Sequence, residues 1–140
     1  MAYFDEHALE MAIMDFLQDE GYKYVRGDSI HRQKNEVLLI DDLKNYLLNR
    51  YADEGLTLSE VNSIIFMLKS VSGTLYEANK SVFKMLCDGF VFNRENRSKK
   101  DLYIEFIDFD NPENNIFRVV NQFEVDGSIT RPEFPTVLYL

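Results

Sequence analysis

The side chains that could do chemistry in this 140-residue chain are carboxylates. Glu6 and Glu10 lie one helical turn apart near the N-terminus, and Glu133 stands between Pro132 and Pro135, where a strand is expected to begin. A divalent hard cation binds carboxylate oxygens that converge from rigid elements. A metal site is therefore one interpretation of these acids, and solvated helix acids beside a chance Pro-acid pair are the other.

Other common catalytic motifs are missing from the sequence. It has no glycine-rich phosphate loop, no nucleophile elbow, no HExxH and no cysteine cluster. His7 and His31 have no Cys or His companion at ligand spacing, which argues against a histidine metal site. Cys87 is the one cysteine; it excludes an internal disulfide framework, suits a reducing cytosol, and is expected to be a buried structural thiol.

Composition and charge indicate one globular domain. Hydrophobic residues make up 46% of the chain and aromatic residues 14%. No 18-residue apolar run or signal peptide is present, so we expect a cytoplasmic protein without a membrane partner. The net charge is −9, with acidic ends (residues 1–22 and 101–140) and a mildly basic middle (residues 23–100). This distribution permits carboxylates beside a basic surface.

An amphipathic helix is expected over residues 5–20. Asp5 can cap it, Phe4 and Leu9 have the spacing of a hydrophobic staple, and Gly21 ends it. Its buried stripe is expected to consist of Leu9, Ala12, Ile13, Phe16 and Leu17. Glu10 borders this stripe, and the helix dipole favours Glu6.

A helical insertion is expected between about residues 39 and 88, after a short strand within residues 22–28. Its helices should span about 39–52, 57–71 and 75–87. Thr57 and Glu60 have the spacing of a capping box.

Two polar segments of this region are less easily assigned. The third helix starts with Tyr76, Glu77, Asn79 and Lys80, which can be read as a solvated helix start. After a short strand over residues 90–92, the basic loop 94–100 could touch a phosphate backbone, although a solvated turn is the usual role of such a run.

A strand meander is expected over about residues 102–140. The first strand, residues 102–107, has apolar groups on both faces and should be interior. A turn over residues 110–115 leads to a strand whose apolar face includes Val119 and Phe123, and Asn121 on that face must find a partner. The third strand should begin near Val137. The whole pattern predicts an α+β (α/β) fold, with the first helix and the helical insertion packed on a mostly antiparallel sheet.

An ordered series of motifs resembles the N-terminal region of type I restriction enzyme R subunits. The motifs are LYEANK (75–80), DGF (88–90), IDFDNPENN (107–115), VVNQFEV (119–125) and RPE (131–133), and GYKYVRGD (21–28) fits the same family. The resemblance covers essentially the whole chain. It implies a PD-(D/E)xK restriction-endonuclease-like fold, of which residues 1–140 would be the N-terminal part.

The resemblance also implies a catalytic Mg²⁺ site. The acid of the family's Arg-Pro-Asp motif corresponds to Glu133. The acid of the family's first helix corresponds to Glu10, with Glu6 as the alternative. Glu10 and Glu133 would both bind the metal. Glu133 is one methylene longer than the family's Asp, and Pro135-Thr136 looks like a small insertion. The family's next strand supplies a Glu-x-Lys pair, which would follow Leu140.

The implied parent protein is a type I site-specific deoxyribonuclease. It would cleave unmodified foreign double-stranded DNA with Mg²⁺, coupled to translocation by an ATP-binding motor domain, and its partners would be modification and specificity subunits. Leu140 falls inside an apolar strand, so we expect the chain to be part of a longer protein and to be inactive alone.

A non-catalytic docking module is the alternative. It would contact the motor or the modification complex, and the helical insertion and the basic middle of the chain favour it. A stand-alone nucleic-acid binder is disfavoured by the acidic ends and by the lack of aromatic residues interleaved with basic ones.

Overall fold

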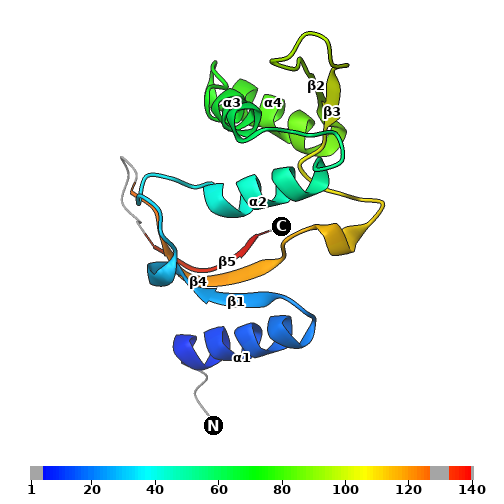
Figure 1. Ribbon diagram of the computed structural model, residues 1–140. Helices are drawn as coiled ribbons and strands as arrows, with labels where there is room; N and C mark the ends of the chain where they lie inside the picture. Colours follow the sequence, from blue (N-terminus) through cyan, green and yellow to red (C-terminus); the bar gives the residue numbers. More distant parts are fainter. Residues whose placement is uncertain (1–4, 127–132, 140) are drawn as a thin grey trace. The chain divides into compact units, whose positions relative to one another are not determined.

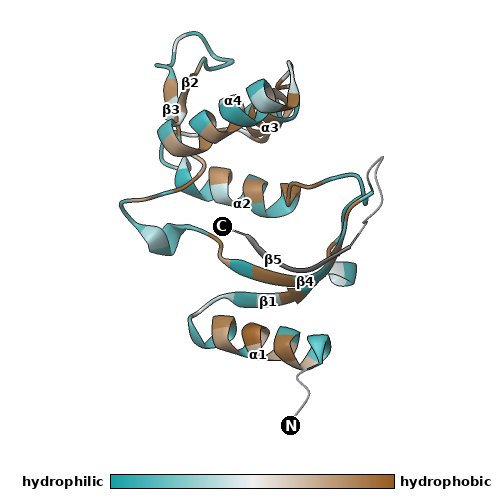
Figure 2. Ribbon diagram, turned by 180° about the vertical axis from the view of Figure 1, so that it is seen from behind, coloured by the Kyte–Doolittle hydropathy of each residue, from teal (hydrophilic) through white to brown (hydrophobic). Residues whose placement is uncertain are grey.

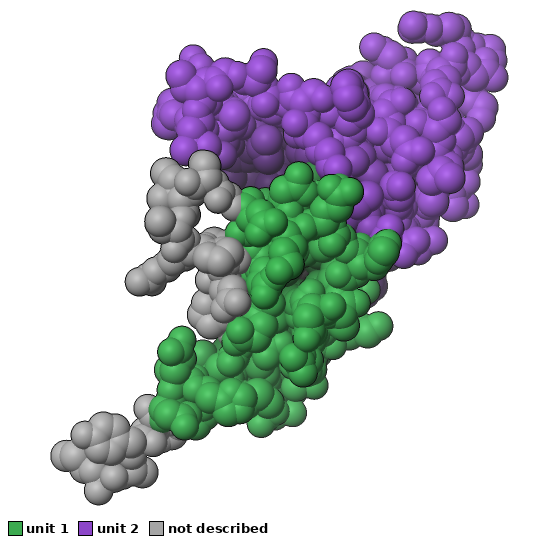
Figure 3. All heavy atoms as spheres, turned by 90° about the vertical axis from the view of Figure 1, so that its left-hand side faces the viewer, with its two compact units in different colours: residues 1–39, 116–140 green, residues 40–115 purple. Residues whose placement is uncertain are grey.

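The structure of the chain divides into two compact units. The computed structural model describes residues 5–126 and the backbone of residues 133–139. Unit 1 combines the two ends of the chain, residues 1–39 and 116–140, and unit 2 is the continuous segment 40–115. Figure 3 shows the two units in separate colours. Each unit is described by itself below.

Unit 1 is a three-stranded mixed sheet with one helix packed against it. The strands are β1 (Lys23–Arg26), β4 (Arg118–Glu124) and β5 (Glu133–Tyr139), in the order β1-β4-β5. β1 pairs with β4 in parallel, and β4 pairs with β5 in antiparallel. The helix α1 (Glu6–Asp19) lies along β1 and β4, as Figure 1 shows.

The central strand β4 supplies the core of unit 1. Val119 and Val120 are fully buried and Phe123 is 1% exposed; Figure 2 shows this apolar stretch in brown. Asn121 is also buried, and its side-chain oxygen accepts a hydrogen bond of 3.0 Å from the Tyr24 hydroxyl of β1. The prediction that Asn121 finds a partner is therefore confirmed.

The helix α1 forms as predicted but packs on a different face. The Asp5 carboxylate accepts a hydrogen bond of 2.7 Å from the Ala8 amide, which confirms the N-cap; Phe4 lies outside the described residues. The buried residues are Glu10 and Met14, whereas much of the expected stripe is exposed: Leu9 52%, Ile13 41% and Phe16 62%. The expected stripe was wrong because α1 carries apolar residues on more than one face, so periodicity alone could not select the packed one.

Unit 2 contains the three predicted helices. They are α2 (Ile40–Arg50), α3 (Leu58–Lys69) and α4 (Leu75–Asp88). α2 packs against α3, and their buried apolar residues are Tyr46, Leu47, Val61, Ile64, Ile65 and Leu68. Two tyrosines near the end of α2 fix the backbone of Glu105. The Tyr46 hydroxyl donates a hydrogen bond of 3.1 Å to the Glu105 carbonyl. The Glu105 amide donates a hydrogen bond of 2.7 Å to the Tyr51 hydroxyl. Burial raises the pKa of Tyr46 to about 12, so this hydroxyl stays protonated at neutral pH.

The helix starts of unit 2 are capped by side chains. Thr57 and Glu60 form the predicted capping box at α3. Thr74 and Glu77 form a second one at α4, so Glu77 is a capping residue within LYEANK rather than only a solvated side chain. The backbone amide of Thr74 holds the pKa of Glu77 below its usual value.

Arg94 is buried, which corrects the expectation of a fully solvated basic loop. Its Nε donates to Glu60 Oε1 at 2.8 Å, and its two terminal nitrogens donate to the carbonyls of Glu54 and Gly55 at 3.0 Å each. Arg94 is 4% exposed and Glu60 2%. These hydrogen bonds, above all those from Arg94, lower the pKa of Glu60 to about 2.

The predicted meander is wrong for its first strand. β3 (Leu102–Ile104) pairs in antiparallel with β2 (Phe90–Phe92), and this hairpin belongs to unit 2. β3 is therefore not an interior strand among the described pairings. Within β3, Ile104 is fully buried and Tyr103 is 53% exposed. The ring of Phe90 in β2 lies 5.6 Å from that of Phe106. At the other end of the meander, β5 begins at Glu133 rather than near Val137.

The Asn-rich turn 110–115 is organised by Asp108. Asp108 accepts hydrogen bonds from the Asn111 amide at 2.9 Å and from Asn114 Nδ2 at 2.8 Å. These two hydrogen bonds lower the pKa of Asp108, and the bond from Asn114 has the larger effect. Arg50 Nε of α2 lies 3.1 Å from Asp108 Oδ2, so this buried acid also has a cation beside it.

Cys87 is exposed, which contradicts the expected buried thiol. None of the residues of α4 is buried. Leu75, Tyr76 and Phe83 are among its exposed residues, at 79%, 74% and 67%.

The two units together make an α+β protein, as predicted. Of the three strand pairings described, two are antiparallel and one, β1 with β4, is parallel. None of the described helices has the length and apolar character needed to cross a membrane.

Candidate active site

Glu10 is a buried acid at the junction of α1 and the sheet. Its side chain is 8% exposed. Gln122 Nε2 of β4 donates to its carboxylate, at 3.1 Å from Oε1 and 3.4 Å from Oε2. His7 Nδ1, one turn earlier on α1, lies 3.8 Å from Oε2 and carries charge only when protonated. No Lys or Arg of the described residues pairs with Glu10.

Gln122 holds an unusual backbone conformation. Its φ is +53°, the one positive value among the described non-glycine residues. A left-handed conformation costs a residue with a side chain roughly 1–2 kcal/mol, and such strain persists only where the surroundings impose it. Pro135 stands opposite Gln122 in the register of β4 and β5 and has no amide to donate, so the ladder is interrupted at this position.

Gly27 makes room for this conformation. A Cβ on Gly27 would lie 2.2 Å from the Gln122 carbonyl oxygen and 2.9 Å from that of Asn121. Gly27 begins the short 3₁₀ helix η1 (Gly27–Ser29) directly after β1, which brings the backbone of η1 against β4. Only glycine fits this approach without a shift of the strand.

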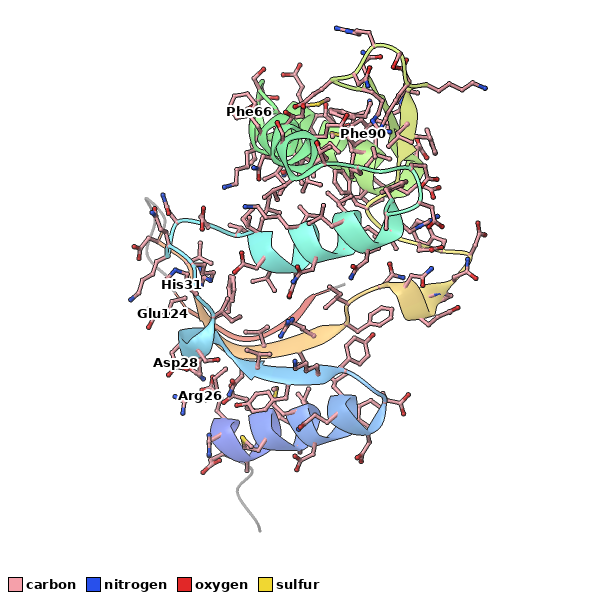
Figure 4. All side chains as sticks on the ribbon, in the orientation of Figure 1. Arg26, Asp28, His31, Phe66, Phe90 and Glu124 are labelled. Atoms are coloured by element: carbon pink, nitrogen blue, oxygen red, sulfur yellow. The ribbon has the colours of Figure 1, made fainter. Side chains whose placement is uncertain are left out.

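A hollow of about 310 Å³ opens at this end of the sheet. It is lined by Gly27, Asp28, Ile30, Arg32, Lys34, Gln122 and Glu124. Figure 4 shows Asp28, His31 and Glu124 lying together at the same end of the sheet. The volume of the hollow is at the lower end of the range for pockets that bind small molecules. The lining of the hollow includes acidic, basic and amide groups.

The charges around the hollow are held by further contacts. Arg26 pairs with Asp28 at 2.8 Å, and Lys34 pairs with Glu124. The Arg32 guanidinium lies 3.7 Å from the centre of the Phe123 ring and donates to the Glu124 carbonyl. The loop after η1 is thereby fixed to the end of β4.

The structure places the predicted site residues unequally. Glu10 is buried against β4, whereas its rival Glu6 is exposed. Glu133 is the first residue of β5 and stands opposite Glu124 in the register, two residues beyond Gln122 along β4. The side chain of Glu133 lies outside the described residues, so the convergence of Glu10 and Glu133 stays a prediction.

Sequence reasoning missed Gln122 and Gly27. Both fall in motifs of the sequence, VVNQFEV (119–125) and GYKYVRGD (21–28), but the sequence alone assigned neither residue a role. Gln122 and Glu10 are 112 residues apart, so no local pattern connects them. The one available signal was a polar residue inside an otherwise apolar strand.

The residues present fit a hard cation only in part. Glu10 offers oxygen ligands, the kind that Mg²⁺ prefers, at a buried position without a competing Lys or Arg. Within the part of the chain that the structure describes, no three His, Cys, Asp or Glu side chains gather in a group that could hold a metal. Glu10 is therefore a candidate ligand that needs others.

Comparison with known proteins identifies the family. The model of the family "Type I restriction enzyme R protein N terminus" matches residues 3–133. The protein named as the type I restriction enzyme MjaIXP endonuclease subunit of Methanocaldococcus jannaschii is 28% identical over 144 residues. The type I restriction enzyme SsaAORF53P endonuclease subunit of Staphylococcus saprophyticus is 29% identical over 135 residues.

The two alignments include most of this chain but a small part of each relative. They cover 92% and 91% of the chain, and the chain spans about 13% of the length of each relative. The family match extends over nearly all of the residues, from the first helix to Glu133. The chain belongs to the family of type I restriction enzyme R protein N-terminal regions.

Proposed function

We propose that this chain is the first part of an endonuclease domain of PD-(D/E)xK type. In the whole protein the domain would cleave unmodified foreign double-stranded DNA with Mg²⁺, coupled to ATP-driven translocation, in a complex with modification and specificity subunits. The observation that carries the proposal is Glu10, a buried carboxylate with no Lys or Arg partner in the part of the chain that the structure describes, held against the strand that leads to Glu133. The family membership and the relatives, which are named endonuclease subunits, support it.

The proposed roles of the residues follow from their positions. Mg²⁺, when bound, polarises the scissile phosphate and lowers the pKa of the attacking water. Glu10 and Glu133 would supply carboxylate ligands from α1 and from the start of β5. Arg32 and Lys34 line the adjacent hollow, where their positive charges would offset the repulsion between the site acids and an approaching phosphate. A Glu-x-Lys pair on a following strand would complete the site, so residues 1–140 alone are proposed to be inactive.

The test uses the full-length subunit in its assembled complex. Glu10→Gln and Glu133→Ala should each abolish Mg²⁺-dependent cleavage while ATPase activity and translocation continue. Glu6→Gln is the matched control, because Glu6 is an exposed acid on the same helix, and it should cleave normally. Unimpaired cleavage by both site variants would refute the proposal. Mg²⁺-dependent nicking by residues 1–140 alone would refute the inactivity of this part.

The second candidate function is a docking module without catalysis. Unit 2 favours it by its exposed large apolar residues, among them Phe66 at 71% and Phe83 at 67%. Exposed apolar residues often mark contacts with other proteins where they form a contiguous patch. Loss of complex assembly on Phe66→Ser or Phe83→Ser, together with normal cleavage by Glu10→Gln, would favour docking over catalysis.

A further inference from the structure

Gln122 is the one described residue other than glycine with a left-handed backbone, and it lies beside the buried acid. This conformation is imposed from both sides of the strand. On one side, the missing side chain of Gly27 leaves room for the Gln122 carbonyl. Further along the strand, the Asp126 amide donates a hydrogen bond of 2.8 Å to the Lys34 carbonyl. The Arg32 guanidinium lies over the Phe123 ring. Strained residues that are over-determined by their surroundings concentrate at functional sites.

With this backbone conformation, the side-chain amide of Gln122 lies against the Glu10 carboxylate. The side-chain amide of Gln122 reaches both oxygens of Glu10, at 3.1 and 3.4 Å. The neighbours Asn121 and Phe123 are buried, whereas Gln122 is exposed, so the side chain is not held there by apolar packing. Among the described residues, the printed hydrogen bonds of the Gln122 side chain both go to Glu10.

An amide suits a carboxylate that must remain available. Asparagine and glutamine donate through neutral NH₂ groups, so Gln122 can orient Glu10 without neutralising it. An Arg or Lys at the same place would form an ion pair and compete with a cation. Hydrogen bonds to ligating carboxylates from residues outside the ligand set are a common means of fixing metal ligands.

We propose that Gln122 is a positioning residue: its amide orients the Glu10 carboxylate toward a divalent cation, and Gly27 makes the necessary backbone conformation possible. This inference rests on the proposed function, because it requires that Glu10 binds the metal. It adds a role for two residues that the site acids alone do not include. The competing explanation is that the Glu10–Gln122 contact only fastens α1 to β4.

The test compares variants of the full-length subunit in its complex. Gln122→Gly removes the amide and relieves the backbone strain, so it isolates the side chain. Gln122→Asn keeps an amide and tolerates the left-handed backbone, but it is one methylene shorter. Gln18→Ala removes an exposed glutamine of α1 as the matched control. The readouts are the Mg²⁺ concentration for half-maximal cleavage, Mn²⁺ binding by electron paramagnetic resonance without DNA, and the melting temperature.

Both Gln122 variants should raise the half-maximal Mg²⁺ concentration by about 10- to 100-fold and weaken Mn²⁺ binding in parallel, with ATPase activity retained. The control should change neither metal readout. A lower melting temperature with unchanged Mg²⁺ and Mn²⁺ dependence would overturn the inference and leave a purely structural contact. If Gln122→Gly does not fold, an unchanged metal dependence of Gln122→Asn overturns it equally.

Different results would refute the proposed function and the positioning role of Gln122. Normal cleavage by both Glu10→Gln and Glu133→Ala would refute the proposed function itself, and the positioning role with it. Loss of cleavage in Glu10→Gln, with unchanged metal dependence in both Gln122 variants, would refute only the positioning role.

Discussion

The two units of this chain treat buried acids in opposite ways. In unit 2, Glu60 has Arg94 at 2.8 Å and Asp108 has Arg50 at 3.1 Å. In unit 1, the described partners of Glu10 are the Gln122 amide and His7, which is charged only when protonated. Glu60, Asp108 and Glu10 are 2%, 2% and 8% exposed, so all three carboxylates are buried and burial alone does not distinguish them.

This difference separates structural acids from an available one. Burying an unpaired charge destabilises a fold, and proteins keep such groups mostly where they act on something. Glu60 and Asp108 are further held by backbone and side-chain donors that organise a helix start and a turn. Among the described residues, Glu10 accepts no hydrogen bond from a backbone amide, and its carboxylate is the one that we propose to bind a cation. Four predictions test this contrast.

The largest expected effect comes from breaking the buried pair of unit 2. Arg94→Met leaves Glu60 buried and unpaired and removes two hydrogen bonds to the carbonyls of Glu54 and Gly55. We expect the free energy of unfolding to fall by about 3–5 kcal/mol, measured by urea unfolding with circular dichroism. Arg97→Met, which changes an exposed base of the same loop, should change it by less than about 0.5 kcal/mol. Equal effects of the two variants would contradict the structural role of the pair.

The second effect comes from filling the space at Gly27 in unit 1. Gly27→Ala places a Cβ against the Gln122 carbonyl, and overpacking of this kind costs about 1–3 kcal/mol. Hydrogen exchange should accelerate in residues 118–124, because β4 must shift. Gly21→Ala is the control: its φ of +97° makes alanine unfavourable, but nothing lies within 4 Å. It should therefore lower stability without changing exchange in β4, and the same change in both variants would contradict the tight approach.

The third effect is the pH dependence that the paired acids of unit 2 create. The folded pKa of Glu60 is about 2, below its ordinary value of 4.5, because Arg94 and backbone amides donate to it. A lowered folded pKa stabilises the fold above the unfolded pKa, and this stabilisation is lost as the pH falls from about 4.5 toward 2. The lowered pKa of Asp108 acts in the same direction.

The variant Glu60→Gln removes this titration. Its stability should therefore fall less steeply than that of the wild type between pH 4.5 and pH 2, measured by thermal unfolding at a series of pH values. Glu113→Gln, in an exposed acid of η2 (Pro112–Asn114), is the control and should keep the wild-type slope. An unaltered slope in Glu60→Gln would show that other groups dominate acid unfolding.

Local patterns predicted the elements of this fold well because helices and caps depend on neighbours in sequence. The capping box at Thr57 and the Asp5 cap were readable directly, and so were the helices of unit 2. Pairings across long sequence distances were not readable. β1 pairs with β4 nearly a hundred residues later, and Arg94 reaches back 34 residues to Glu60.

The sequence predicted the candidate site only as far as local motifs reach, and it did not predict contacts between distant segments. Family motifs indicated Glu10 and Glu133, but the choice of the buried face of α1 depends on a contact with Gln122 that only the folded sheet creates. The helix periodicity predicted that Leu9, Ile13 and Phe16 would be buried, and they are exposed because α1 presents Glu10 and Met14 to the sheet instead.

The smallest effect provides the sharpest test of the contrast between the units. Glu10→Gln removes a buried charge that pairs with no Lys or Arg among the described residues, so weaker hydrogen bonding with Gln122 is offset by the smaller cost of burying a neutral amide. We expect the free energy of unfolding to change by less than about 1 kcal/mol, with any change toward greater stability, as is common when a functional group is removed. Glu60→Gln is the same chemical change at a paired site and should cost about 2 kcal/mol or more, both measured by urea unfolding. A loss of similar size at Glu10 would mean that its charge stabilises unit 1 as Glu60 stabilises unit 2, and the acid of α1 would then be a structural residue rather than one kept available for a cation.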